Sequence, residues 1–471
     1  MKKILLSGIL MIGLLSFSQT TITSGTLDKK KPLVKFDYLP ITNRLIVEEA
    51  YDRNSQNGLF NYALVFDALG KRDSIIKKDN FVELIFSKSE KNYKLFNQNG
   101  YFSKPYFKFF NNGKDYTEIT DCNNCHGTFA DFFTDIYQLK LMNQKKNFNI
   151  KIESDILYLE KHNFITNTTK SISIKYPNIN RLKSKDLDIP SRIAFQKNIY
   201  DDKSFELITK SVSKDNKSMT LYKTKYDLEG KLLSDIAFNI LSPKGELVCV
   251  YNAHTLQNRY YSTPILTMNV PAKDLDINDH YVDPVTKDVY IFGISRDNGP
   301  LGFYLFKFDE GGVKIWEKFY DIDNPKGFNQ NNQLWNMLTI SLYEYMDTKT
   351  IAISIDGEYS YTKRYNHFFI INKDNGNLDL SKTMDSYTDT GKGGLTSISK
   401  YSIFETTKLE KNKYCSEKTL LAYTLNDKVK KYIDGITGKK DVMFDTYISP
   451  KGLWLLESDN DDYYKVTLFK D

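Results

Sequence analysis

Short runs of aromatic and β-branched residues alternate along this chain with turns rich in Asp, Asn and Gly. Residues 302–320 (GFYLFKFDEGGVKIWEKFY) show the pattern most clearly, with an apolar run on either side of Asp309-Glu310-Gly311-Gly312. Such a pattern predicts two antiparallel strands joined by a tight turn, in which glycine supplies the positive φ angle. Four further segments follow it: residues 61–75, 220–236, 367–384 and 419–433.

A second type of segment precedes several of these hairpins and is typical of a buried inner strand. Residues 287–295, 349–357 and 449–458 belong to it, and residues 242–252 open on the same Ser-Pro-Lys-Gly sequence as the last of them. An inner strand, a loop, a hairpin and a connector follow one another in a four-stranded propeller blade. The 471 residues also exceed the usual size of one core, which favours a repeat architecture.

The spacing of the turns predicts an all-β fold, a β-propeller of about seven blades, within a range of six to eight. The widest gaps leave room for degenerate blades around Tyr158 and Tyr251, and the last strands are expected to close the ring by pairing with N-terminal strands. A β-sandwich array with similar hairpins is the alternative. The predicted turns lie near Asp67, Asn112, Asp227, Asp309, Asp374 and Asn426.

One unit carries a resemblance to a known group of proteins. Asp309, Gly312 and Trp316 form an Asp-x-x-Gly-x-x-x-Trp sequence that resembles the blade repeats of quinoprotein-like bacterial exported propellers. About five units share the general pattern, but the tryptophan position holds Ser234 or Leu380 in others. The resemblance implies the propeller fold and no cofactor residues, since such repeats occur in many propellers without a quinone.

The first residues have the three parts of a secretory signal peptide. Lys2 and Lys3 precede an apolar run, Ile4 to Leu15, which is too short to span a bilayer, and small residues then predict cleavage before Gln19. We therefore expect an exported protein, periplasmic or extracellular and bacterial. No later segment reaches the length of a membrane span, and the net charge of +6 is interspersed, so neither a membrane span nor nucleic-acid binding is expected.

These features predict four divisions of the chain: a signal peptide at 1–18, an N-terminal tail at 19–42 and a propeller at 43–471 that contains an insertion at about 120–150. Within the insertion, Thr128 to Met142 places five apolar side chains at helical spacing, with Thr128 as the N-cap. A short helix is therefore expected between two blades.

The insertion also contains the one short chemical motif of the chain. Cys122-Asn-Asn-Cys125-His126 matches the pattern of covalent haem c attachment, in which two thiols reach the porphyrin vinyl groups and the imidazole reaches the iron. The surrounding strands are unlike a helical cytochrome domain, and the distal ligand has to be sought among Met142, His162 and Met219. Haem is therefore the alternative to a protein without a cofactor.

The same cysteines allow other interpretations in an oxidising compartment. Cys122 and Cys125 can form a short-loop disulfide, and Cys249 and Cys415 a second one, although four cysteines allow three connectivities. A zinc site on Cys122, Cys125 and His126 is less favoured because no second ligand pair follows. A redox Cys-x-x-Cys site would require a βαβ unit, which the sequence does not show.

Other candidate chemistry is weak. Ser295 lies in Gly293-Ile-Ser-Arg-Asp297, which lacks the final glycine of a hydrolase elbow and reads as the end of a strand. Asp274 to Asp279 alternates oxygen ligands as calcium requires, but without the glycine and glutamate of an EF-hand loop, and a solvated loop is the preferred interpretation; the acidic run 459–462 has the same status. No catalytic residue is predicted.

Three functions remain open. The leading hypothesis is a non-enzymatic exported propeller that binds an unidentified protein or glycan through loops on one face of the ring. The second is a periplasmic electron-transfer protein with one covalently attached c-type haem. The third is a carbohydrate- or peptide-directed hydrolase or lyase that uses carboxylates at the propeller centre, for which the sequence names no residue.

Overall fold

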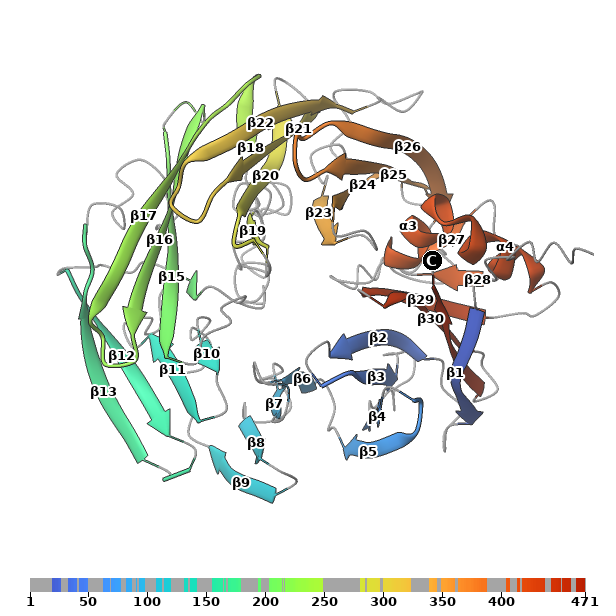
Figure 1. Cartoon of the computed structure of the whole chain (residues 1–471), viewed down its shortest axis with the longest axis horizontal. Coiled ribbons are helices and arrows are strands. Elements are labelled where there is room, and N and C mark those ends of the chain that lie inside the picture. Colours follow the sequence, from blue (N-terminus) through green and yellow to red (C-terminus); the bar gives the residue numbers. More distant parts are fainter. Residues whose placement is uncertain are drawn as a thin grey trace, which may run out of the picture.

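The computed structural model of the chain is a ring of small antiparallel sheets (Figure 1). All statements below concern the residues that it describes. These are residues 19–26, 33–39, 42–49, 62–67, 69–77, 82–86, 90, 93–97, 107–111, 114–119, 131–133, 136–141, 155–163, 165–166, 168–178, 194–195, 203–213, 215, 217–248, 280–283, 286–296, 300–322, 339–344, 349–360, 363–387, 404–406, 413–415, 417–436, 442–449, 451–458 and 463–470.

The first four blades each contain four strands, ordered from the centre of the ring outward. Blade 1 consists of β2 (Leu33–Leu39), β3 (Arg44–Glu49), β4 (Tyr62–Phe66) and β5 (Arg72–Lys77). Blade 2 consists of β6 (Val82–Phe86), β7 (Tyr93–Asn97), β8 (Phe107–Asn111) and β9 (Lys114–Ile119). Blade 3 consists of β10 (Asp131–Phe133), β11 (Tyr137–Leu141), β12 (Ile156–Asn163) and β13 (Thr168–Lys175). Blade 4 consists of β14 (Ala194–Phe195), β15 (Ser204–Val212), β16 (Ser218–Asp227) and β17 (Leu232–Leu241).

The remaining three blades complete the ring, and blade 5 has its inner strand in two pieces that both pair with β20. Blade 5 consists of β18 (Glu246–Val248), β19 (His280–Val282), β20 (Val289–Arg296), β21 (Pro300–Phe308) and β22 (Lys314–Asp321). Blade 6 consists of β23 (Thr339–Glu344), β24 (Thr350–Ser360), β25 (Lys363–Asn372) and β26 (Leu378–Tyr387). Blade 7 consists of β29 (Val442–Ser449), β30 (Gly452–Ser458), β31 (Tyr463–Phe469) and β1 (Gln19–Thr26).

The ring therefore has seven blades in the described part of the chain, as the sequence predicts. The predicted closure is also confirmed, because β1 pairs antiparallel with β31 from Gln19 opposite Phe469 to Thr26 opposite Tyr463. The outer strand of blade 7 thus comes from the opposite end of the sequence. The range 19–42, expected as a tail, contains β1 and β2, while the predicted signal peptide lies outside the described residues.

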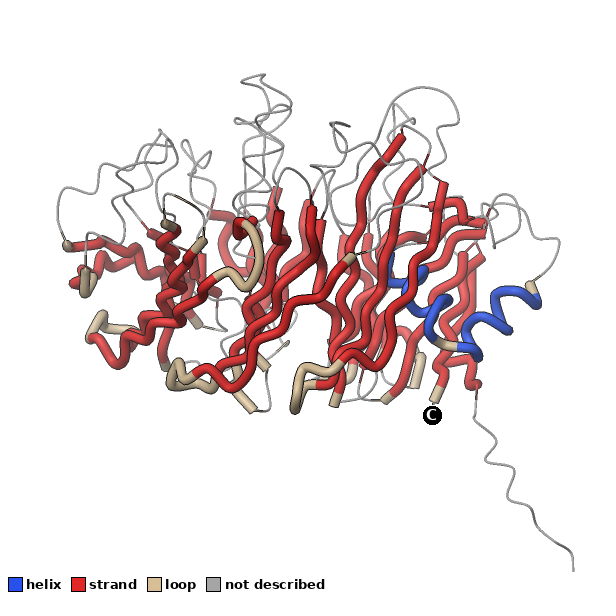
Figure 2. The backbone as a smooth tube through the Cα atoms, turned by 90° about the horizontal axis from the view of Figure 1, so that it is seen from above, coloured by secondary structure: helices blue, strands red, loops and turns tan. Residues whose placement is uncertain are grey.

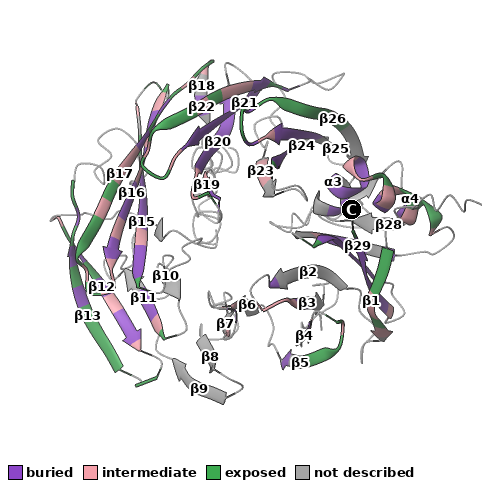
Figure 3. Cartoon of the chain, in the orientation of Figure 1, coloured by how far each residue is buried: buried purple, intermediate pink, exposed green. Residues whose placement is uncertain are grey.

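The core of the molecule is a series of apolar clusters, each formed where two neighbouring blades face one another. Tyr226 of blade 4 packs with Leu139 of blade 3, and Phe369 of blade 6 packs with Phe303 of blade 5. Figure 3 shows buried residues along middle strands such as β20 and β24, and exposed residues along outer strands such as β26. Because five of the blades (1, 4, 5, 6 and 7) contribute to two described clusters each, these blades are stabilised by their neighbours on both sides.

The prediction of a helix at 128–142 is wrong for the described residues of this segment, which form β10 and β11. The sequence Tyr137-Gln-Leu-Lys-Leu141 also alternates with period two, which fits the strand that forms. Leu139 is fully buried against Leu157 and Leu159, and β11 pairs with both β10 and β12.

The two described helices lie instead where the sequence suggested a hairpin at 419–433. They are α3 (Glu417–Leu425) and α4 (Asp427–Gly435), and the predicted turn residue Asn426 is the N-cap of α4. The helices connect β28 (Lys413–Cys415) to the parallel strand β29, and a parallel pair requires a crossover. With β27 (Phe404–Thr406), β28 joins blades 6 and 7 into one continuous sheet. Among the described residues, no helix is long and apolar enough to cross a membrane.

Candidate functional site

The turns between the third and the outer strands of blades 1, 4, 5 and 6 lie at the same end of the blades, which we call the turn face. Several of the described turns follow the lower edge of the ring in Figure 2. Asp309 opens the turn of blade 5: its N–H donates to the Val313 carbonyl at 2.9 Å, and its carboxylate accepts the Val313 N–H at 2.8 Å. Asp67 and Asp227 open their turns with the same main-chain bond to Lys71 and Lys231.

Each of these turns has a glycine at positive φ that lies against the outer strand of the preceding blade. A Cβ atom on Gly312 (φ +89°) would lie 2.9 Å from the Ala237 carbonyl oxygen of blade 4, and one on Gly230 (φ +90°) would lie 2.9 Å from the Ser173 carbonyl oxygen of blade 3. Gly70 and Gly376 show the same relation to Ile22 of β1 and Trp316 of β22. The Asp-x-x-Gly sequence is therefore a contact between blades as well as a turn.

A lysine of the preceding blade completes the contact at two junctions. Lys161 Nζ donates to the Leu228 carbonyl oxygen at 3.1 Å, and Lys307 Nζ donates to the Lys373 carbonyl oxygen at 3.1 Å. Both lysines lie in a third strand, two residues before Asn163 or Asp309 at its end. Each accepting carbonyl belongs to the first residue inside the next turn, so the two bonds are equivalent in the repeat.

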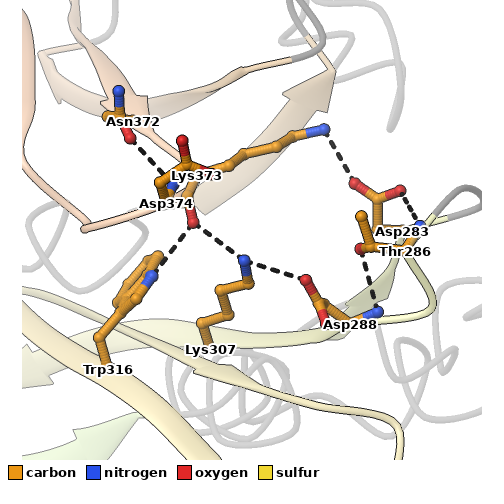
Figure 4. Close-up of polar contacts among 8 residues, drawn as sticks. All are labelled: Asp283, Thr286, Asp288, Lys307, Trp316, Asn372, Lys373 and Asp374. Atoms are coloured by element: carbon orange, nitrogen blue, oxygen red, sulfur yellow. Dashed lines mark hydrogen bonds and ion pairs between the residues drawn. The ribbon is translucent and has the colours of Figure 1, made fainter.

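The junction of blades 5 and 6 contains the largest polar cluster of this kind (Figure 4). Lys307 forms an ion pair with Asp288 at 2.9 Å, and Lys373 forms one with Asp283 at 3.0 Å. The four side chains are between 4% and 15% exposed. Trp316 Nε1 donates to the same Lys373 carbonyl at 3.1 Å, so this oxygen accepts hydrogen bonds from two side chains of blade 5.

The charges of this cluster indicate that it stabilises the junction of blades 5 and 6 rather than transferring protons. Lys373 is matched by the buried Asp283 and Lys307 by the half-buried Asp288, which compensates the cost of removing the lysine charges from water. Tyr290 lies beside Lys307, whose Nζ is 5.6 Å from the ring centroid, and burial followed by the nearby Asp288 and Asp283 charges raises the pKa of Tyr290 well above its ordinary value. The phenol therefore stays neutral at physiological pH.

The junction of blades 3 and 4 has a more exposed version. Glu229 accepts from Lys161 at 2.7 Å and from Lys170 at 3.2 Å, and Lys161 Nζ lies 4.4 Å from the centroid of the Tyr137 ring. The hydrogen bonds from Lys161 and then Lys170 lower the pKa of the Glu229 carboxyl below its ordinary value. The geometry again holds a turn against the preceding blade.

A third set of contacts surrounds the inner turns, which join the first two strands of a blade. Glu90 (φ +59°) accepts from the Thr42 N–H at 2.7 Å and from Thr42 Oγ1 at 3.0 Å, which links blade 2 to blade 1. Lys451 of blade 7 donates to Asn43 (φ +62°) of blade 1. With Lys287 (φ +65°), these are the described non-glycine residues at positive φ, and all three lie in inner turns.

The residues singled out in the sequence are mostly not placed by the structure. Cys122, Cys125, His126 and Cys249 lie outside the described residues, as do the calcium candidate 274–279 and the acidic run 459–462. Cys415 ends β28, where its backbone pairs with Phe404 and Phe444. No group of three or more His, Cys, Asp or Glu side chains that could hold a metal ion occurs within the described ranges.

Ser295 lies in β20, as the strand interpretation predicts, and its hydroxyl donates to the Lys244 carbonyl. The lysines at the blade junctions were missed, although the sequence carries a signal for them. A Lys-x-Asp or Lys-x-Asn sequence ends the third strand in three consecutive blades, at Lys161, Lys225 and Lys307.

No protein family matches the sequence, and no characterised protein is similar enough to it to be identified as a relative. Comparison with solved structures returned several β-propellers, including the following three. The WD40 domain of SCAP from fission yeast is 9% identical, with 95% of this chain and 98% of that chain covered and a TM-score of 0.38. The Pan2 WD40 domain from Neurospora crassa is 8% identical, with 97% and 98% covered and a TM-score of 0.37. The β-propeller domain of the Trilobed protease from Pyrococcus furiosus is 7% identical, with 93% and 96% covered and a TM-score of 0.36.

Proposed function

We propose that this protein is an exported, non-enzymatic β-propeller that serves as a binding or scaffold module, and that its protein or glycan partner binds at the face opposite the turn face. The observation that supports this proposal is that side chains and glycines of the turn face contact the neighbouring blade. Gly312 lies against a neighbouring backbone, and Lys307 and Lys373 are held in buried ion pairs. Side chains held in this way are not available to a ligand, which leaves the opposite face for recognition.

Strand direction gives the opposite face the longer connections. Strands β3, β9 and β26 all run away from the turn face and end at the opposite face, at Glu49, Ile119 and Tyr387. The next strands begin at Tyr62, Asp131 and Phe404. Loops that vary on a rigid scaffold are where binding proteins usually carry their specificity.

The experiment compares the two faces in the same protein. Residues 388–403 are replaced by a Gly-Ser linker of the same length, and the matched control is Glu310→Ala in the exposed turn of blade 5. Proximity labelling in the exported fraction of the native host then identifies neighbours. We expect the linker variant to lose specific neighbours and the control to keep them. The reverse result would contradict the assignment of the faces.

The export part of the proposal has a separate test. N-terminal sequencing of the mature protein is expected to start at Gln19, and cell fractionation is expected to find the protein outside the cytoplasm. An intact N-terminus beginning at Met1 in cytoplasmic material would contradict export without affecting the fold.

A second candidate function follows from Cys122, Cys125 and His126, which match the covalent haem attachment pattern in a compartment where such haem is attached. When bound, a haem would supply one-electron transfer. The chain is expressed with haem-maturation machinery, and its absorption spectrum is compared with that of Cys125→Ala. A reduced c-type band that the variant lacks supports this function, and a colourless mature product contradicts it.

A further inference from the structure

β1 is held differently from outer strands such as β13 and β17. None of its residues from 19 to 25 is buried, and Figure 3 shows β1 as a largely exposed strand beside the buried blade 7. By contrast, β13 buries Ile172 and Ile174, and β17 buries Phe238 and Ile240. The apolar contribution to binding is therefore smaller for β1 than for β13 or β17, and in this respect β1 is similar to β26, whose Leu378 and Leu380 are exposed.

The covalent connection of β1 is different as well. β13, β17 and β22 follow the third strand of their own blade through a short turn, whereas β1 pairs with β31 from the other end of the sequence. No hairpin links β1 to its blade. Because no tight turn connects β1 to β31, β1 can separate from β31 without unfolding β31.

The edge that β1 covers is formed by buried residues of blade 7. Val466 and Leu468 of β31 are 0% and 3% exposed, and they pack with Trp454 and Leu456 in the cluster between blades 7 and 1. β1 adds the half-buried Ile22 to this cluster. A Cβ atom on Gly70 would lie 1.9 Å from the Ile22 carbonyl oxygen, so β1 fits between β31 and the turn of blade 1.

We propose that the outer edge of β31 is an exchangeable strand-binding site, and that its partner is the β1 segment of a second copy of this chain. The second copy presents the same Gln19–Thr26 sequence, so the observed register and the contact of Ile22 can form between two copies without any new interaction. Reciprocal exchange gives a closed two-fold dimer in which each ring is completed by the strand of the other.

The first test measures binding of a fluorescent peptide of residues 19–26 to the full-length mature chain. Ile22→Ala weakens the strand held within the same molecule and leaves β31 unchanged, while Thr20→Ala in the same strand is the matched control because Thr20 is exposed. We expect Ile22→Ala to bind the wild-type peptide about tenfold more tightly than the unaltered chain does, and Thr20→Ala to bind it equally. A folded Ile22→Ala chain that binds no peptide, or that binds a scrambled peptide equally well, overturns the proposal.

The second test uses the unaltered chain and does not depend on the stability of a variant. Two copies with different C-terminal tags are mixed at high concentration, and heterodimers are counted by native mass spectrometry with and without excess peptide. We expect heterodimers that excess peptide prevents. A chain that remains monomeric, or dimers that persist in excess peptide, would show that the β31 edge is not the site of exchange.

Discussion

Lys307 Nζ in blade 5 donates a hydrogen bond to the main-chain carbonyl oxygen of Lys373 in blade 6, at 3.1 Å. The same ammonium group pairs with Asp288, and the Lys373 side chain pairs with Asp283. Lys307 thus binds a turn carbonyl oxygen of blade 6 and also a carboxylate of its own blade, blade 5. Because the turn also presses its glycine against Trp316, the two blades are fixed both by charge and by shape.

Replacing Lys307 with Met is expected to destabilise the protein strongly. The change leaves the half-buried Asp288 without its cation, and losing one partner of a largely buried ion pair costs up to about 3 kcal/mol. Urea denaturation followed by tryptophan fluorescence measures the free energy of unfolding. The control is Lys314→Met, which removes an exposed pair with Glu317 and is expected to change stability by less than about 1 kcal/mol. Equal losses in both variants would contradict a special role of the buried lysine.

The adjacent glycines of blade 5 give a sharper comparison. Ala at Gly312 must adopt φ +89° and would bring its Cβ to 2.9 Å from the Ala237 carbonyl oxygen, whereas Cβ at Gly311 would have only the Asp309 side chain, 3.3 Å away, as its nearest contact. We expect Gly312→Ala to lower the free energy of unfolding by about 1–3 kcal/mol and Gly311→Ala to have a much smaller effect. Thermal unfolding of the two variants measures both losses of stability. A larger loss of stability for Gly311→Ala than for Gly312→Ala would contradict the contact between the blades.

The sequence predicted the repeat well because its signals are local. The turn at Asp309 needs only its own aspartate and glycine, and the neighbouring apolar runs indicate the strands on each side. The number of blades and the closure followed from the spacing of such turns. What the turns contact could not be predicted, since Gly312 meets Ala237 through the order of blades in space.

Two predictions of secondary structure were wrong, the helix at 128–142 and the hairpin at 419–433. Leu139 belongs to a helical series with Phe132 and Ile136 and also to a strand series with Tyr137 and Leu141. Pairing with β10 and β12, the strands on either side of β11 in the sequence, selects the strand. At α3 and α4, the need for a crossover between parallel strands overrides the hairpin signal of Asn426-Asp427.

Asn426 now has a role that can be tested. Its side-chain oxygen accepts from the N–H groups of Lys428 and Val429 at 3.1 Å each, which caps the free end of α4. Asn426→Ala is expected to cost about 1 kcal/mol, and Asn426→Asp is expected to cost little because aspartate caps equally well. Chemical denaturation measures both variants. If Asp is as damaging as Ala, the capping role is wrong.

The ion pairs of Glu229 predict a loss of stability in acid. Hydrogen bonds from Lys161 and Lys170 hold the pKa of Glu229 below its ordinary value of 4.5, so the folded state binds this proton less readily than the unfolded state does. The stabilisation is therefore complete above that ordinary value and is lost as the pH falls through the lower pKa of the folded protein.

Glu229→Gln removes this dependence at a partly exposed site, where the effect is reduced by solvent screening. We expect the unaltered chain to exceed the variant in melting temperature at about pH 7, and the difference to shrink as the pH falls through the lowered pKa of Glu229, because the protonated carboxyl is then neutral as glutamine is. Glu310→Gln in the exposed turn of blade 5 is the control and is expected to show a smaller change. A difference that grows in acid would mean that the charge of Glu229 destabilises the junction of blades 3 and 4, contrary to the geometry of Lys161 and Lys170.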